Sequence, residues 1–526
     1  ASKLLLSSIT VDNVSTSVDD SLGVVVDNDS TISNFAVSKI TPVSIASGKT
    51  LSGSIGITAG SLKLTDTGSI ASAVSMSGGT TLDADNSLTV SGTLTHTGDI
   101  TIDVLDNKTL SYSGAPLSLG SHTLSILGAG ILSNVSGSPL VLDQTGSILD
   151  LKGSGTVSGA VKLESGTLKS SGSATISGVL TQYSDATIEV PASQTLSYSG
   201  ASLSLGANTL RITGGGAFSN TNSLVLDDAA SKLHLSSITV GSVSTSVDDS
   251  LGVVVENDST ISNFAVSNTT PVSIASGKTL EGSIGVTAGS LKLTETGTLA
   301  SAVSMSGGTT LDADNTLTVS GALTHAGDIT IDVAGTLTYT GAPISLGEHT
   351  LKLMGGGSLL SGGLDINKAA SKLLLSSITV DNVSTSVGDS LGVVVENDST
   401  ISNFAVSNTT PVSIASGKTL EGSIGVTAGS LKLTETGTLA SAVSMSGGTT
   451  LDADNTLTVS GALTHAGDIT IDVAGTLTYT GAPISLGEHT LKLMGGGSLL
   501  SGGLDINKAA SKLLLSSITV DNVSTS

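Results

Sequence analysis

Short segments in which apolar and polar residues alternate follow one another along the chain. Examples are SLKLT at 290–294, TLTVS at 316–320, DITIDV at 328–333 and TLTYT at 336–340. Alternation with a period of two, in segments rich in β-branched residues, is typical of β-strands with one buried face. Glycine, asparagine, aspartate and serine separate the segments, as they do at corners. The pattern predicts an all-β chain without helices.

The alternating segments also group into larger blocks. From Ser52 onward, blocks of about 20 residues each hold two or three such segments. This period predicts a parallel β-solenoid (β-helix), in which each rung stacks on the one below at about 4.8 Å. About 26 rungs would then form a rod about 125 Å long. Six representative residues are expected to form apolar ladders inside the coil: Leu317, Val319, Ile329, Ile331, Leu337 and Leu351.

The blocks are organised into long repeats. Residues 231–370 and 371–510 are consecutive 140-residue copies, and residues 511–526 begin a further unit. Residues 1–230 form a longer unit with an internal duplication, in which the segment 110–124 recurs at 196–210. The two copies differ at four pairs of positions: His234/Leu374, Gly241/Asp381, Ser242/Asn382 and Asp248/Gly388. Seven rungs of about 20 residues account for the copied length, which indicates a module that generates length.

A string of immunoglobulin-like β-sandwich domains is the main alternative fold. It is also all-β and also occurs in repetitive surface proteins. The long repeat exceeds the usual length of one sandwich, and no tryptophan is present to mark a sandwich core. The shorter period of the blocks therefore favours the solenoid.

Composition and charge narrow the function. The 526 residues carry a net charge of −23 and one arginine, Arg211, which argues against nucleic acid and anionic membranes as partners. The absence of cysteine excludes disulfides and thiolate metal sites. No apolar run reaches the length of a membrane-spanning helix, so we expect no membrane insertion. A mean hydropathy of +0.35 argues against a disordered chain.

The motif GGTTLDADN provides the candidate binding residues. It occurs three times and places two aspartates at i, i+2 beside an asparagine, a set of oxygen ligands that suits Ca²⁺. An ordinary asparagine- and aspartate-rich corner is the simpler interpretation. No other cofactor is expected. The nine candidate ligands are Asp83, Asp85, Asn86, Asp312, Asp314, Asn315, Asp452, Asp454 and Asn455.

Catalytic and ice-binding interpretations are weaker. A polysaccharide hydrolase needs two carboxylates at a defined separation, usually with aromatic platforms, but Tyr339 and Tyr479 are isolated in the sequence. We therefore expect no enzyme. No two histidines lie at ligand spacing within one segment, so surface or corner positions are expected for them. Ice binding would need regular threonine rows, yet Ala322 and Ala326 interrupt one. Met354 and its copy Met494 are expected to fill the core at a corner.

Runs such as GTLTYTGAPISLGEHTLKLMGGGSL at 335–359 and SGALTHAGDITIDVAGTL at 320–337 resemble the passenger β-helices of autotransporter and filamentous-haemagglutinin-type bacterial adhesins. The resemblance implies a protein of the cell surface or extracellular space, used as a stalk or for adhesion to other cells or surfaces. We expect a structural shaft whose partner is itself, as stacked repeats of one long chain or as chains joined end to end. The alternative is an adhesin whose ligand-binding face or tip lies outside this sequence.

Overall fold

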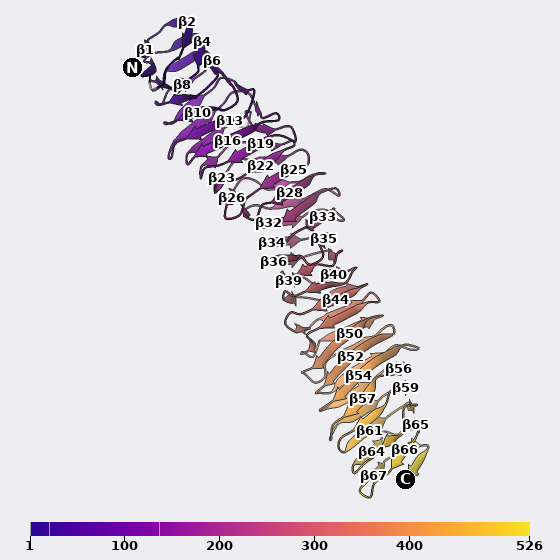
Figure 1. Cartoon of the computed structure of the whole chain (residues 1–526). Coiled ribbons are helices and arrows are strands. Elements are labelled where there is room, and N and C mark those ends of the chain that lie inside the picture. The colour runs from indigo at the N-terminus through magenta and orange to yellow at the C-terminus, as the bar shows by residue number, and fades with distance from the viewer. Residues whose placement is uncertain (1, 20, 136, 526) are drawn as a thin grey trace. The chain divides into compact units, whose positions relative to one another are not determined.

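The computed structural model describes residues 2–19, 21–135 and 137–525, and within them every regular element is a β-strand. The chain divides into two compact units, residues 1–265 and 266–526. In each unit the strands stack one above another in a repeating coil (Figure 1). This confirms the predicted all-β parallel solenoid. The sandwich alternative is wrong, because the strands pair in parallel with the strands of neighbouring turns.

One turn of the second unit shows how a rung is built. Strand β37 (Ser290–Leu293) lies on the first face, and β38 (Thr298–Leu299) and β39 (Ala302–Met305) follow on the next two. The chain then returns to the first face as β40 (Thr310–Ala313), directly beside β37. Short bends and glycine turns separate these strands, so the alternation restarts at each corner.

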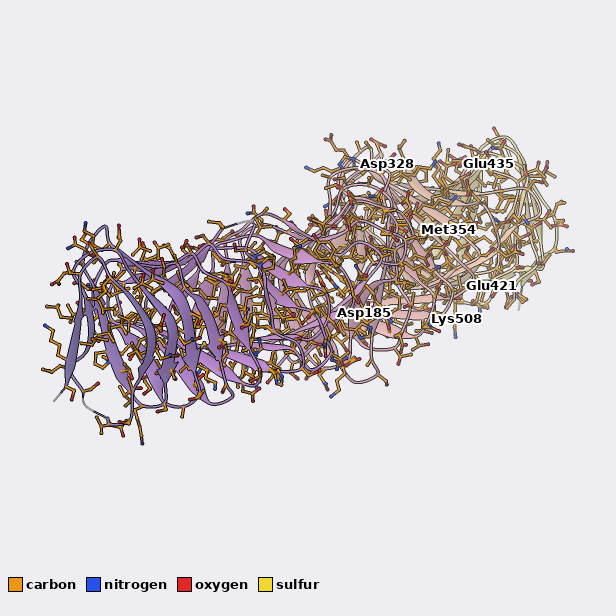
Figure 2. All side chains as sticks on the ribbon, turned by 90° about the horizontal axis from the view of Figure 1, so that it is seen from above. Asp185, Asp328, Met354, Glu421, Glu435 and Lys508 are labelled. Atoms are coloured by element: carbon orange, nitrogen blue, oxygen red, sulfur yellow. The ribbon has the colours of Figure 1, made fainter. Side chains whose placement is uncertain are left out.

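Strands of neighbouring rungs pair in register, so the inward apolar residues of one rung stack on those of the next and form ladders. Leu291 pairs with Leu311 on the first face, Leu299 with Val319 on the second, and Val303 with Leu323 on the third. All six representative residues predicted to point inward are buried, with exposures of 4% or less. Polar side chains cover the outside, and Figure 2 shows Asp328, Glu421 and Glu435 at the outer surface of the second unit.

Rung length is close to the prediction but varies. Paired residues on the first face lie 19 positions apart at Val24 and Val43, and 25 apart at Thr123 and Ile148. Within the described residues, each unit contributes thirteen first-face strands, so the chain holds the expected 26 rungs. Strands β35 (Thr270–Ile274) and β53 (Thr410–Ile414) are seven such strands apart, so the long repeat spans seven rungs.

Some rungs merge their second and third faces. Strands β52 (Ser399–Val406) and β54 (Thr419–Val426) are single eight-residue strands, and their pairing shifts register between Ile401 and Phe404. A β-bulge of this kind bends a strand without ending it. The corner between two faces is therefore made by a bulge in these rungs and by a turn in others.

The prediction for methionine is wrong. Met354 ends β46 (Thr350–Met354), in which Leu351 and Leu353 are buried. Strict alternation then turns the Met354 side chain outward, where it is half-buried and pairs with Asp332 of the rung below. Its copy Met494 holds the same position in β64 (Thr490–Met494).

Candidate functional site

The three acidic turns lie at equivalent places on the first face. The first aspartate of each motif, Asp83, Asp312 or Asp452, projects from the outer side of a strand: β10 (Thr80–Ala84), β40 or β58 (Thr450–Ala453). The second aspartate follows at the end of the strand, and the asparagine begins the corner. The solenoid thus places each pair of carboxylates on one side of the rung, as the i, i+2 spacing predicts.

A lysine from the preceding rung lies between the two carboxylates. The Nζ of Lys292 is 3.7 Å from Oδ2 of Asp312 and 3.2 Å from Oδ2 of Asp314. Lys63 and Lys432 make the same pairs in the other copies, at 2.9–3.7 Å. Each lysine belongs to the SLKLT segment, one rung before its aspartate. That spacing of one rung is the signal by which the sequence could have revealed the contact.

The asparagines of the motif bind the backbone rather than each other. Asn86 Nδ2 donates a hydrogen bond to the carbonyl oxygen of Thr65 at 3.5 Å, and Asn315 and Asn455 donate in the same way to Thr294 and Thr434. Each bond joins one corner to the corner of the rung below. The asparagines therefore tie the corners of neighbouring rungs together, rather than only bonding the backbone of their own turn.

A third carboxylate stacks over each pair. Asp332 lies directly above Asp312 in register, and Asp103 and Asp472 lie above Asp83 and Asp452. Each strip therefore holds three carboxylates and one ammonium that contacts two of them, an excess of negative charge on this part of the first face. Calcium binding stays a prediction, and the ion would have to displace the lysine from the position where a cation is already held.

Burial and charge crowding affect the first aspartate of each turn. Burial raises the pKa of Asp83, Asp312 and Asp452 above the ordinary carboxyl value. The negative charge of the following aspartate raises the pKa further, while the nearby lysine opposes the rise. The lysines are also affected, because the hydrogen bond from Lys292 to Asp314 raises the pKa of Lys292.

These shifts predict that acid stabilises the rungs of the acidic turns. A carboxyl group whose pKa is higher in the folded state favours folding when protonated, and this contribution is lost as pH rises through the folded-state pKa. We expect the double variant D312N/D452N to raise the melting temperature at about pH 7 by about 2 °C, because asparagine removes a half-buried charge. The variant should also gain less stability than the natural chain on acidification to about pH 4.

Thermal unfolding by circular dichroism at both pH values tests this expectation. The matched control is E435Q, since Glu435 is an exposed carboxylate in a corner of the same unit (Figure 2). If D312N/D452N lowers the melting temperature at neutral pH, the lysine contacts outweigh the cost of burial, and the assigned sign is incorrect.

The structure brings six of the seven histidines together in pairs that the sequence spacing does not suggest. His325, at the end of β42 (Leu323–His325), meets His349 edge to face with ring centroids 5.7 Å apart. The pairs His96–His122 and His465–His489 repeat this contact at 5.6 and 5.7 Å. The two partners come from separate strands and turns, beyond the reach of any rule that applies within one strand. Only the stacking of rungs joins them.

In the pair His325–His349, both ring nitrogens of His325 already lie against backbone carbonyl oxygens. Its Nδ1 lies 2.9 Å from the carbonyl oxygen of Gly327, and its Nε2 lies 3.0 Å from that of Ser345 on the next rung. A metal ligand or a general base needs an available lone pair, and both nitrogens already face carbonyl acceptors. Within the described part of the chain, no group of three or more acidic or histidine side chains is placed to hold a metal ion.

Four of the five tyrosines are structural, and the fifth, Tyr183, is exposed with Lys162 Nζ 5.3 Å from its ring centroid. The hydroxyl of Tyr339 donates to the carbonyl oxygen of Ala342 at 2.8 Å and accepts from the backbone N–H of Leu323 at 3.1 Å. The same double contact recurs at Tyr112, Tyr198 and Tyr479. A buried tyrosine thus ties one rung to the next and offers no platform for a sugar.

A hollow on the first face of the first unit lacks the groups for glycoside hydrolysis. It has a volume of about 260 Å³ and contains one carboxylate, that of Asp185, whose Oδ1 accepts the N–H of Thr209 at 2.7 Å. Arg211 at its edge is held by Glu256. Hydrolysis of a glycosidic bond requires two facing carboxyl groups, which this hollow does not present.

Among the described residues, no helix is long and apolar enough to cross a membrane. Comparisons of the chain with family models, with curated proteins and with solved structures find no match.

Proposed function

We propose that the chain is a structural protein, the rigid shaft of an extracellular fibre, stalk or giant surface adhesin. The observation that carries the proposal is that its long repeat spans seven rungs. Copying a whole number of rungs lengthens a solenoid while leaving every ladder in register. The ladders are indeed repeated without loss, since Leu291 and Leu431, and Leu299 and Leu439, are all fully buried.

Main-chain pairing supports a mechanical role. Within each unit, hydrogen bonds join every rung to the next on the first face, and apolar ladders fill the interior. In the first unit, the interior cavity among Leu82, Val90 and Tyr112 measures about 10 Å³, no larger than one water site. A shaft needs such a continuous core, whereas an enzyme needs a pocket. Neither a reaction nor a cofactor forms part of the proposed function.

Self-association is part of the proposal. Each inner ladder is closed to solvent where one rung covers the next, as at Leu375 and Val383, which are 0% and 2% exposed. The main-chain pairing between rungs continues in the same way along each unit, and strand edges can pair with further strands. We therefore propose that the chain's partner is a further set of its own rungs, covalently continuous or from a second copy.

Cryo-electron microscopy of the native material tests the proposal. We expect extended particles outside the cell, with a repeat of about 4.8 Å along their axis. Immunogold labelling of intact cells with an antibody against the purified chain gives the location. Labelling confined to the cell interior, or compact particles without the axial repeat, would overturn the shaft proposal.

A further inference from the structure

The few differences between the two repeat copies lie mostly where a repeat meets the rung before it. In one copy the first rung contains β31 (Lys232–Ser236) and β32 (Thr239–Thr245), and in the other β49 (Lys372–Ser376) and β50 (Thr379–Thr385). Three of the four differences fall on this rung, and the two rungs that precede it also differ in sequence. The fourth, Asp248/Gly388, lies in the following loop.

In the first copy, an amide from the lower rung bridges the junction. Asn220, at the end of β29 (Ala217–Asn220), accepts the backbone N–H groups of Gly241 and Ser242 on Oδ1, at 3.0 and 3.2 Å. Its Nδ2 donates to the carbonyl oxygen of Ser242 at 2.6 Å. A Cβ at position 241 would lie 2.6 Å from the Asn220 backbone oxygen and 2.8 Å from Oδ1. Only glycine fits this close approach.

In the second copy, the amide comes from the upper rung instead. Ser361, at the end of β47 (Ser358–Ser361), stands where Asn220 stands in the first copy, since each pairs with a tyrosine of the rung below. Asn382 Nδ2 now reaches down and donates to the Ser361 carbonyl oxygen at 3.0 Å. With no asparagine below, position 381 accommodates an aspartate.

A third junction repeats the second arrangement. Ser501 has the same position as Ser361, and Asn522 Nδ2 donates to its carbonyl oxygen at 2.9 Å. Asp521, the counterpart of Asp381, accepts the N–H of Ser501 on Oδ1 at 2.6 Å. In both of these junctions, a serine at the end of the lower rung's strand lies under Asp–Asn of the upper rung. In the first junction, an asparagine in the lower rung lies under Gly–Ser of the upper rung.

The third difference on this rung, His234/Leu374, also depends on the residue that it meets on the rung below. His234 pairs in register with Arg211 of the lower rung, and both contact Glu256 of the rung above. In the second copy, Leu374 pairs with Lys352, whose Nζ lies 3.9 Å from Glu396. The histidine thus accompanies the arginine–glutamate pair and is replaced by leucine where a lysine takes the place of the arginine.

We propose that the first rung of each repeat recognises the rung before it through one bridging amide, supplied by either rung but not by both. The asparagine type has Asn220 below Gly241–Ser242, and the serine type has Ser361 below Asp381–Asn382. The partner that the Asp–Asn surface fits is a rung that ends in serine, and the Gly–Ser surface fits one that ends in asparagine. The pairing rule concerns the interface between rungs and stands whether or not the chain forms a shaft.

A set of exchanged residues in the full chain tests the rule. N220S leaves the first junction with no bridging amide, and we expect the amides of β32 to exchange with deuterium about tenfold faster. N220S/G241D/S242N converts the junction to the serine type and should restore slow exchange. If the triple variant exchanges as fast as N220S, the two rungs are not coupled and the proposal fails.

The second junction gives the reciprocal test. S361N places two amides in one junction, and S361N/D381G/N382S converts it to the asparagine type. The backbone amides of β50 should exchange with deuterium faster in S361N than in the natural chain. In S361N/D381G/N382S their exchange should become slow again. G388D is the matched control, because it exchanges the one differing residue outside the junction and should leave β50 unchanged. Equal exchange rates in S361N and the natural chain would contradict the requirement for a single amide.

Discussion

Replacing Gly461 with alanine is expected to disrupt the rungs around it, with a loss of about 3 kcal/mol in unfolding free energy. Gly461 forms the corner after β59 (Leu457–Val459), where the chain passes close to the rung below. A Cβ there would lie 1.8 Å from the carbonyl oxygen of Ser441. That oxygen belongs to the backbone and cannot rotate away, so the corner would have to shift and weaken the bond from Gly461 N–H to Leu439.

The matched control is Gly425→Ala. Gly425 lies inside β54 of the same unit, and no atom lies within 4 Å of the position of its added Cβ. Alanine lowers the entropy of the unfolded chain, so G425A should be neutral or stabilising by about 0.5 kcal/mol. Urea unfolding with residue-resolved hydrogen exchange measures both variants, because a long repeat array need not unfold in one step. Equal stability of G461A and G425A would show that the corner is looser than the structure indicates.

The second large effect is expected for Phe404→Ala. Phe404 is fully buried in β52 and pairs with Val383 below and Ile424 above. Removing the ring leaves a cavity between three rungs, and substitutions of this kind cost about 3–5 kcal/mol. The stacked neighbours are held by their own ladder hydrogen bonds, so they cannot collapse into the space.

Leu500→Ala provides the comparison for Phe404→Ala. Leu500 lies in β65 (Ser498–Ser501) and is 42% exposed on the outer face, so its loss should change stability by no more than about 0.5 kcal/mol. We expect exchange to quicken in β50, β52 and β54 for F404A but nowhere for L500A. A stability loss in F404A as small as that of L500A would mean that the core tolerates a cavity of this size.

Local patterning was sufficient to predict the rungs and the inward residues. Alternation along one strand decides which side chains share a face, and this depends only on backbone geometry. The six representative ladder residues are therefore buried as expected, and each long copy contains seven rungs. Met354 shows where residue type alone misleads. Its apolar side chain suggested the core, but its place in the alternation along β46 turns the side chain outward.

The candidate site was only partly predictable. The motif places two aspartates on one side of the strand, but the residue that neutralises them, Lys292 for Asp312 and Asp314, lies one rung earlier. The pairing of His325 with His349 also depends on how two rungs stack. Neither contact is encoded within a single segment, because each depends on the length of the intervening rung, which differs from one rung to another.

The amino-acid sequence alone thus established the class of fold, the rung period and the inner ladders, because all three follow from alternation and repetition along one strand. Contacts between rungs required the tertiary structure: the lysine among the aspartates, the paired histidines, and the bridging amide that Asn220 supplies from below and Asn382 from above. Register between stacked strands depends on corner geometry and rung length together, so a change of one residue in either would bring different side chains into contact.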